Sequence, residues 1–232
     1  FGIALNTSDP RMIFDWINHR YLFVIVSYDN SCGVNCTAPA FYSLAVSTSN
    51  NPAAGWCLYS NIPVATSPNP VAGFYAFPDY PRLGQDREAV YLASNLFRPG
   101  YIGEEIIALR KTDLYACRPV TAAAVTGLSN GFTIQPANVF SASDDPKSMF
   151  FVTSFFATTN QLVVSSFHSP FSSPTFTQVT INAANTYSTP PDATQKGTSN
   201  LISTNDQRIS GSPFFAAGSI YAALATNGGN GE

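Results

Sequence analysis

The chain of 232 residues is 45% hydrophobic and 13% aromatic, which is ample material for a core, and all-β folds of this length are commonly single domains. Only 11% of the residues are charged, against about 25% in ordinary soluble domains, and the net charge of −3 argues against a nucleic-acid partner, which needs clustered Lys and Arg. No apolar run approaches the ~20 residues of a membrane span. No signal peptide is present at Phe1, so we expect a removed leader or an internal piece of a longer chain.

The first repeating unit is expected over residues 9–63. Its second segment, Tyr21–Tyr28, is almost continuously apolar and rich in β-branched and aromatic residues, which predicts a strand buried on both faces. A dense group of turn-forming residues over Thr48–Gly55 precedes the last strand. The four strands of this antiparallel meander are predicted at Met12–Trp16, Tyr21–Tyr28, Phe41–Ser47 and Trp56–Ile62.

Two similar units and part of a fourth follow, at approximately 77–126, 132–182 and 205–232. A proline-rich connector precedes the second unit, and a long polar loop precedes the fourth. No segment keeps the apolar spacing of a helix, so none is predicted. The strands are predicted at Arg82–Gly84, Ala89–Phe97 and Glu105–Leu114, with a weaker one after Cys117, then at Thr133–Ser141, Ser148–Phe156, Gln161–His168 and Thr175–Ile181, and finally at Arg208–Ala216 and Ser219–Thr226.

A short motif precedes the alternating strands: an aspartate, a proline or polar residue, an arginine and an apolar residue. It occurs as Asp9-Pro10-Arg11, Asp79-Tyr80-Pro81-Arg82 and Asp206-Gln207-Arg208, with a degraded copy at Gln135-Pro136-Ala137-Asn138. Repeats of this size are one supersecondary unit each, and repeated four-stranded meanders predict propeller blades. A β-sandwich is the rival architecture, but it would not need the motif to recur. We therefore predict a single all-β domain over residues 1–232, a β-propeller of four-stranded antiparallel blades with about three and a half blades present, as a segment of a larger propeller.

The stretch LAVSTSNNPAAGW at Leu44–Trp56, followed by FPDYPRLG at Phe77–Gly84, resembles a family of secreted β-propellers. In that family an S-x-S-(N/D)-P-x-x-G-W turn precedes a D-Y-P-(R/K)-L-G blade start. The resemblance covers residues 9–97 and implies a module of a large exported protein, distantly similar in architecture to sialidases. The sialidase Asp-box is absent, because Asn50-Asn51-Pro52 replaces its aspartate, and the sialidase site residues have no assignable counterparts here.

The four cysteines, Cys32, Cys36, Cys57 and Cys117, suggest disulfides, because their number is even and the chain is poor in charge and rich in Ser and Thr. Buried free thiols are the alternative. A zinc site is disfavoured, since the first pair has no second pair or nearby His to complete it. Three connectivities are open, and we favour Cys32–Cys36 within one loop and Cys57–Cys117 between the outer edges of neighbouring units.

Two glycosylation sequons are present, Asn6-Thr7-Ser8 and Asn35-Cys36-Thr37. Both asparagines, Asn6 and Asn35, are expected in loops or at a chain end, where a sugar does no steric harm. Together with the cysteines they favour an extracellular or cell-surface glycoprotein.

The candidate ligand-binding residues are the charged residues of the recurring motif. If each motif opens the innermost strand of a blade, they all point toward one mouth of the central channel: Asp9, Arg11, Asp79, Arg82, Asp206 and Arg208. They would bind an anion, a sugar or a metal ion, or they would only bridge adjacent blades, which is the simpler interpretation. No cofactor or metal is predicted, and the isolated His19 and His168 form neither a zinc site nor a catalytic triad.

Because no catalytic motif can be assigned, we expect a non-catalytic extracellular module with a structural, adhesive, glycan-binding or protein-binding role. The alternative is a carbohydrate-active enzyme, a glycosidase or lyase, with its site at the channel mouth. Its carboxylate pair would have to come from residues that mostly lie in predicted turns, where solvation is expected: Asp79, Asp86, Glu88, Glu104, Glu105, Asp113, Asp144 and Asp145.

Closed propellers have about four to eight blades, so the chain is expected to be incomplete as a folding unit. The remainder of a longer chain or another copy would close it, and a glycan or a surface protein is the other expected partner. Residues Gly2–Asn6 could supply one closing strand, and Asn227–Glu232 is expected to begin a turn.

Overall fold

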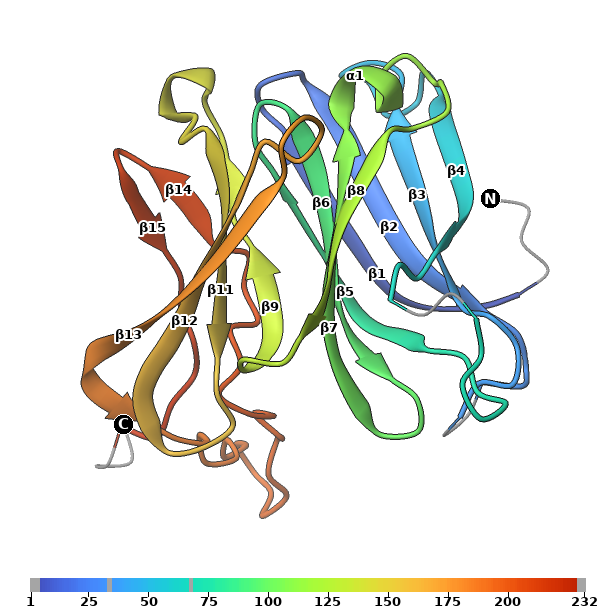
Figure 1. Ribbon diagram of the computed structural model, residues 1–232. Coiled ribbons are helices and arrows are strands. Elements are labelled where there is room, and N and C mark those ends of the chain that lie inside the picture. Colours follow the sequence, from blue (N-terminus) through green and yellow to red (C-terminus); the bar gives the residue numbers. More distant parts are fainter. Residues whose placement is uncertain (1–4, 33–34, 67–68, 229–232) are drawn as a thin grey trace.

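The computed structural model describes residues 5–32, 35–66 and 69–228. The described part is almost entirely β-structure, arranged as sheets that stand side by side in sequence order (Figure 1). The all-β prediction is therefore confirmed, and so are the four-stranded antiparallel meanders within it. In the described ranges, no helix has the length and apolarity that a membrane crossing requires.

The first sheet begins earlier than its sequence pattern predicts. The segment before Met12 also pairs with the second strand, and the register shifts between Ser8 and Arg11, which marks a β-bulge. This part of the strand consists of polar residues and Pro10, so it lacks the alternating apolar pattern by which strands are predicted. The strands, in sheet order, are β1 (Asn6–Asp15), β2 (Arg20–Tyr28), β3 (Phe41–Ser47) and β4 (Trp56–Pro63).

The second sheet contains a short helix that the sequence pattern does not predict. The strand expected over Glu105–Leu114 ends at Arg110, and the helix begins at the next residue. Its first residue, Lys111, places its ammonium 2.8 Å from Asp15 of the first sheet, and its N–H donates to the Glu88 carbonyl. The elements are β5 (Phe77–Gln85), β6 (Ala89–Phe97), β7 (Tyr101–Arg110), α1 (Lys111–Leu114) and β8 (Ala122–Leu128).

The third sheet departs from prediction at its first strand, expected over Thr133–Ser141. This segment divides at Ala137, and its second part leaves the sheet to pair in parallel with β5. Gly84 on β5 permits the close approach, since a Cβ there would lie 2.5 Å from the Ala137 carbonyl oxygen. The elements are β9 (Phe132–Pro136), β10 (Asn138–Val139), a 3-10 turn (Ala142–Asp144), β11 (Ser148–Ser154), β12 (Thr159–His168) and β13 (Thr175–Tyr187).

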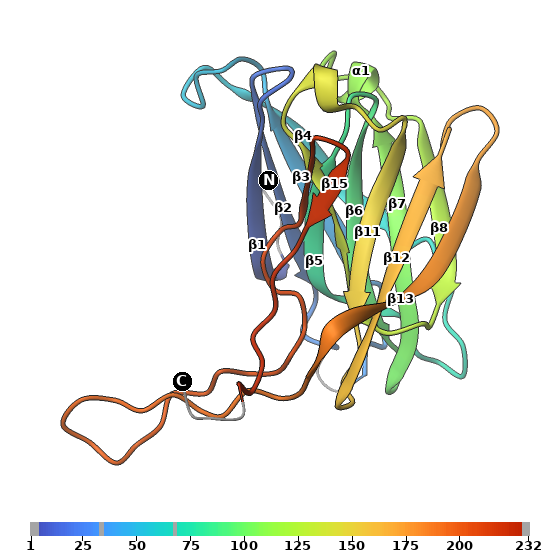
Figure 2. The ribbon, with the colours of Figure 1, turned by 90° about the vertical axis from the view of Figure 1, so that its left-hand side faces the viewer.

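The fourth unit is a small hairpin of β14 (Phe214–Ala216) and β15 (Ser219–Tyr221), shorter than the strands predicted there. Pro213 has no N–H for a ladder, and β14 pairs in parallel with β10. Because β10 also pairs with β5, the hairpin extends the second sheet to seven strands, in the order β15-β14-β10-β5-β6-β7-β8. The preceding polar loop extends away from the sheets (Figure 2). Residues 2–4 of the predicted closing strand, and 229–232 of the predicted last turn, lie outside the described residues.

Two apolar cores flank the second sheet, which is therefore buried on both faces. Val90 and Leu92 of β6 pack toward the first sheet, and Tyr91 packs toward the third. In β2, by contrast, Leu22 and Val24 are fully buried and the alternate residues only partly. The prediction of a strand buried on both faces is thus wrong for β2, and the structure places that environment at β6.

Both cysteine pairs join as the favoured connectivity predicts. One disulfide closes the loop between Cys32 and Cys36, and the other joins Cys57 of β4 to Cys117, which follows α1. The second bond therefore links the outer strand of the first sheet to the second sheet.

Adjacent glutamates on β7 connect the second sheet to both of its neighbours. Glu105 accepts hydrogen bonds from the Tyr42 hydroxyl and the Thr66 N–H, both at 2.8 Å. Glu104, on the opposite face, accepts from the Ile134 N–H at 2.6 Å. Both glutamates are buried, so the solvation expected for the candidate carboxylates is wrong for this pair. They face opposite sides of a strand and cannot form one catalytic pair.

We predict that stability decreases with pH because of Glu104. Burial raises the pKa of Glu104 to about 8, from 4.5 in the unfolded chain, although hydrogen bonds from Ile134 and Thr133 oppose the rise. The carboxyl therefore takes up a proton on folding, and the free energy of unfolding should decrease from pH 4.5 to about 8, by at most about 5 kcal/mol. Urea denaturation across this pH range measures the effect.

The variant Glu104→Gln keeps an oxygen acceptor but cannot ionise, so its stability should depend less on pH. Part of the dependence should remain, because burial also raises the pKa values of Glu105 and Asp86. Glu88→Gln, at an exposed carboxylate, is the control and should keep the original slope. An unchanged slope in Glu104→Gln would contradict a neutral buried carboxyl.

Candidate functional site

The motif arginines project from matching bulges on β1 and β5. Asp9 has a φ of 53° and Tyr80 a φ of 55°, in the left-handed region, and each register shift ends at the arginine, Arg11 or Arg82. The extra residue bends the strand and re-aims the side chains that follow it. The two arginines therefore occupy the same place in their sheets.

The structure corrects the alignment of the motif copies. Asp9 corresponds to Tyr80, so Asp9 and Asp79 occupy neighbouring rather than equivalent positions. In the third sheet the left-handed residue is Thr133, with a φ of 65°, and Gln135 lies two residues further, as the arginines do. Gln135, and not Ala137, is thus the counterpart of the motif arginines. The signal that identifies it is backbone conformation, which the sequence does not display.

Tyr80 is the centre on which the predicted site residues meet. The guanidinium carbon of Arg11 lies 4.7 Å from the centroid of its ring, that of Arg208 lies 5.1 Å away, and the guanidinium of Arg82 stacks directly on the ring. Asp79 belongs to the same group, because the charges of Asp9, Arg208 and Arg82 act on its pKa. The six predicted residues therefore gather at one place. Tyr80 belongs to the motif but is not among the candidate residues predicted from the sequence.

Only one pair of these charges is joined directly. Arg208 donates from Nε and Nη2 to the Asp206 carboxylate, at 2.7 and 2.5 Å. Burial would raise the pKa of Asp206, but the hydrogen bonds from Arg208 hold it below its ordinary value. Burial, reinforced by the Asp9 charge, raises the pKa of Asp79. Among the described residues the salt bridges are Arg208–Asp206 and Lys111–Asp15.

Arg82 is the least satisfied member of the group. Its side chain is 3% exposed, and its Nε and Nη2 have no hydrogen-bond acceptor among the described residues. Burial, then repulsion from Arg11 and Arg208, lowers its pKa to about 8. A cavity of about 160 Å³ adjoins it, lined by Arg11, Met12, Ile13, Tyr80, Arg82, Leu83, Ser210 and Ser212. We call this the Arg82 cavity.

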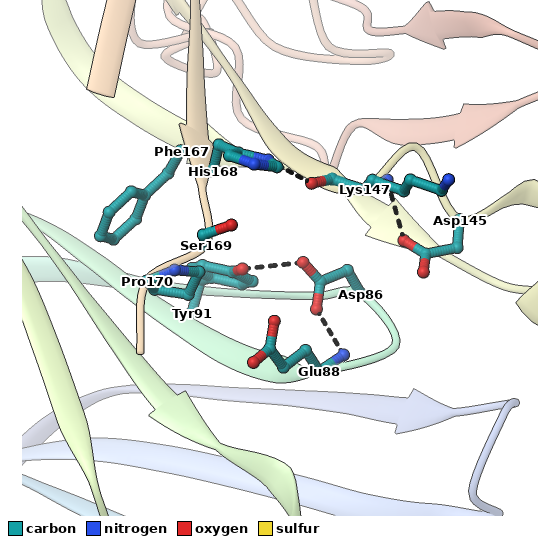
Figure 3. Close-up of a pocket in the computed structure, with 9 residues that line it drawn as sticks. All are labelled: Asp86, Glu88, Tyr91, Asp145, Lys147, Phe167, His168, Ser169 and Pro170. Carbon is teal, nitrogen blue, oxygen red and sulfur yellow. Dashed lines mark hydrogen bonds between the residues drawn. The ribbon is translucent and has the colours of Figure 1, made fainter. Parts of the chain in front are cut away.

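A second cavity, of about 230 Å³, lies between the second and third sheets (Figure 3). Asp86, Glu88 and Tyr91 line it from the second sheet. Asp86 is 6% exposed, and its carboxylate accepts from the Tyr91 hydroxyl at 2.7 Å and from the N–H groups of Glu88 and Ala89 at 2.8 Å. The lining from the third sheet consists of Asp145, Lys147, Phe167, His168, Ser169 and Pro170. The solvation predicted for Asp86 is thus wrong, because its turn is covered by the third sheet.

Asp15 and Asp86 stabilise equivalent turns, because each carboxylate accepts hydrogen bonds from the N–H groups two and three residues later. They differ in whether a lysine pairs with them. Lys111, the residue after β7, pairs with Asp15, so the pKa of Asp15 stays low although burial would raise it. Ser169, the residue after β12, occupies the corresponding place next to Asp86 and has no charge. Burial accordingly raises the pKa of Asp86. The cavity of Figure 3 lies between the second and third sheets, at the position that Lys111 fills between the first and second sheets.

The other predicted residues lie apart from Tyr80. His19 is exposed in the β1–β2 turn, and His168 ends β12. Asn6 is exposed, although it begins β1 rather than lying in a loop, and Asn35 is partly buried in the Cys32–Cys36 loop. No group of three His, Cys, Asp or Glu residues able to hold a metal ion occurs in the described ranges.

We predict that Ser169→Lys stabilises the protein. A lysine at this position should reach Asp86 as Lys111 reaches Asp15, and its hydrogen bond to the carboxylate would raise the free energy of unfolding by on the order of 1–3 kcal/mol. Thermal and urea unfolding provide the measurement. Ser169→Gln, with similar length and no charge, is the matched control, and the gain should vanish in an Asp86→Asn background. Equal effects of Lys and Gln would contradict the proposed pairing.

Comparisons with protein-family models, with curated proteins and with solved structures find no match to this chain. The resemblance to secreted β-propellers therefore remains a hypothesis. The interpretation of the residues around Tyr80 depends on their own geometry.

Proposed function

We propose that the sheets are blades of a β-propeller and that the terminal hairpin belongs to a further blade. Four-stranded antiparallel meanders that pack face to face in sequence order support this architecture. So does the recurrence of one bulge in β1, β5 and β9, the first strand of each meander. In a propeller these first strands line the channel, and the residues around Tyr80 would lie at its mouth.

We further propose that the protein is a non-catalytic extracellular module that binds a ligand at the Tyr80 site. The observation that carries this proposal is the convergence of three arginines on one ring beside a cavity. Residues with a purely bridging role should pair arginine with aspartate between sheets. The one direct pair in this group instead joins Arg208 and Asp206 within a single segment.

An extracellular location is supported by the two disulfides, which persist in oxidising compartments, and by the low content of charged residues. The exposed Asn6 is accessible to a glycan if the source is eukaryotic. A structural or adhesive role is compatible with the same location, and a glycan or a surface protein is the proposed partner.

The binding function can be tested with a glycan array and a panel of surface proteins. Tyr80→Ala removes the ring on which the arginines gather, so we expect it to weaken binding at least about tenfold. Trp16→Ala is the control, because Trp16 is an exposed aromatic residue in the β1–β2 turn. Undiminished binding by Tyr80→Ala would place the ligand elsewhere.

A carbohydrate-active enzyme is the alternative function. A broad glycan-substrate screen should detect no turnover by the protein. Turnover that is abolished by Asp79→Asn or by Arg82→Gln would overturn the non-catalytic proposal and place a glycosidase or lyase at this site.

We predict that the chain self-associates when it is expressed alone. The terminal hairpin exposes Phe214 and Tyr221, at 36% and 48%, and β13 exposes Val179 and Ile181. Open apolar faces and unpaired strand edges promote association. Light scattering should therefore show oligomers, and Tyr221→Lys, which charges the edge, should reduce them. A stable monomer that unfolds cooperatively would contradict closure by a longer chain or another copy.

A further inference from the structure

The unsatisfied edge of Arg82 has a defined shape. Nε and Nη2 lie on the same side of the planar guanidinium, so their N–H groups point in parallel. Both atoms are buried and have no acceptor among the described residues, whereas Nη1 donates to the Pro81 carbonyl at 3.2 Å. A buried guanidinium edge with two unpaired donors is costly unless acceptors come within hydrogen-bond reach, and a carboxylate supplies two of them in matching geometry.

Arg208 shows what this edge binds in the same protein. Its Nε and Nη2 donate to the two carboxylate oxygens of Asp206, at 2.7 and 2.5 Å. Arg208 and Arg82 contact the same Tyr80 ring, so they share much of their surroundings. The difference is that no carboxylate of the described chain lies within salt-bridge distance of Arg82.

The charges around Arg82 favour an anion. Repulsion from Arg11 and Arg208 lowers the pKa of Arg82 by more than attraction by Asp9 and Asp79 raises it. The adjoining cavity, of about 160 Å³, is also lined by Arg11, Ser210 and Ser212, whose side chains carry further donors. That volume holds about five water molecules, which is room for a carboxylate and a few attached atoms.

We propose that the Nε–Nη2 edge of Arg82 binds the carboxylate of a small-molecule ligand that enters the Arg82 cavity past Ser210 and Ser212. This rests on the proposed binding function and specifies the chemical class of its ligand. The two oxygens accept from Nε and Nη2, Arg11 supplies a second positive charge, and Tyr80 holds the guanidinium plane in place.

Acetate is the simplest probe, with acetamide as its uncharged isostere and chloride as a control for ionic strength. In heteronuclear NMR spectra, acetate should produce a saturable shift of the Arg82 Nε–H signal and of the Leu83 backbone amide. Acetamide and chloride should not reproduce it. An acetate titration without a saturable change at these signals would overturn the proposal.

Variants locate the contact. Arg82→Lys keeps a positive charge but loses the two-donor edge, so acetate affinity should fall about tenfold or more. Ser212→Phe blocks the exposed mouth and should abolish binding while leaving Arg82 intact, which keeps the test valid if Arg82→Lys fails to fold. Arg118→Gln, at an exposed arginine far along the chain, should bind as the original protein does. Undiminished acetate binding by both cavity variants would refute the assignment.

The outcomes separate this inference from the proposed function. If a glycan or protein binds in a Tyr80-dependent way but acetate does not bind at Arg82, the proposed binding function stands and the proposed carboxylate ligand is refuted. Acetate binding at Arg82, with no glycan or protein bound at Tyr80, would keep the carboxylate site and remove the proposed partner. D-Glucuronate compared with glucose then tests whether the carboxylate belongs to an acidic sugar.

Discussion

The second sheet is enclosed by apolar cores on both faces, and this constraint governs the rest of the structure. Polar groups on such a sheet are shielded from water, so they are costly unless they find a partner, and most of the partners available lie on a neighbouring sheet. The Nε and Nη2 atoms of Arg82 are the exception on β5. Glu105 accepts hydrogen bonds from the Tyr42 hydroxyl and the Thr66 N–H, and Glu104 accepts one from the Ile134 N–H. The sheets are thus held in register by hydrogen bonds at a few points and by non-directional apolar burial elsewhere.

The same constraint explains why the contacts between successive sheets differ. At the first contact, Lys111 neutralises Asp15, and the disulfide between Cys57 and Cys117 reinforces it. At the second contact the lysine is replaced by Ser169, so a buried carboxylate is left beside a cavity. Repeats that share a backbone therefore diverge in the side chains that join them, and cavities form where a partner is lost.

Much of this fold could be predicted from the sequence, because alternation and turn residues are local signals. The strands Tyr21–Tyr28, Phe41–Ser47 and Ala89–Phe97 show them clearly, and the structure places β2, β3 and β6 there. The bulges arise from backbone conformation that residue type does not reveal. The division at Ala137 and the helix at Lys111 involve contacts between segments far apart in the sequence, which no local pattern encodes.

The candidate site was predictable to a similar extent. Recurrence of the motif indicated that its charged residues would gather, since equivalent positions of repeats lie close together when the repeats pack around a common centre. The central role of Tyr80 and the empty edge of Arg82 arise from backbone conformation and from the absence of an acceptor. Neither property is carried by residue type.

The parallel strand β10 has a consequence for how the protein folds. It lies between β5 and β14, so one ladder joins segments that are far apart in the chain, such as Gln85, Asn138 and Phe214. The ladder cannot close until the long polar loop has brought its last strand back, and such non-local pairing raises contact order and slows folding. The terminal hairpin should therefore dock last, onto sheets that are already assembled, and should be the first part to detach under mechanical or thermal stress.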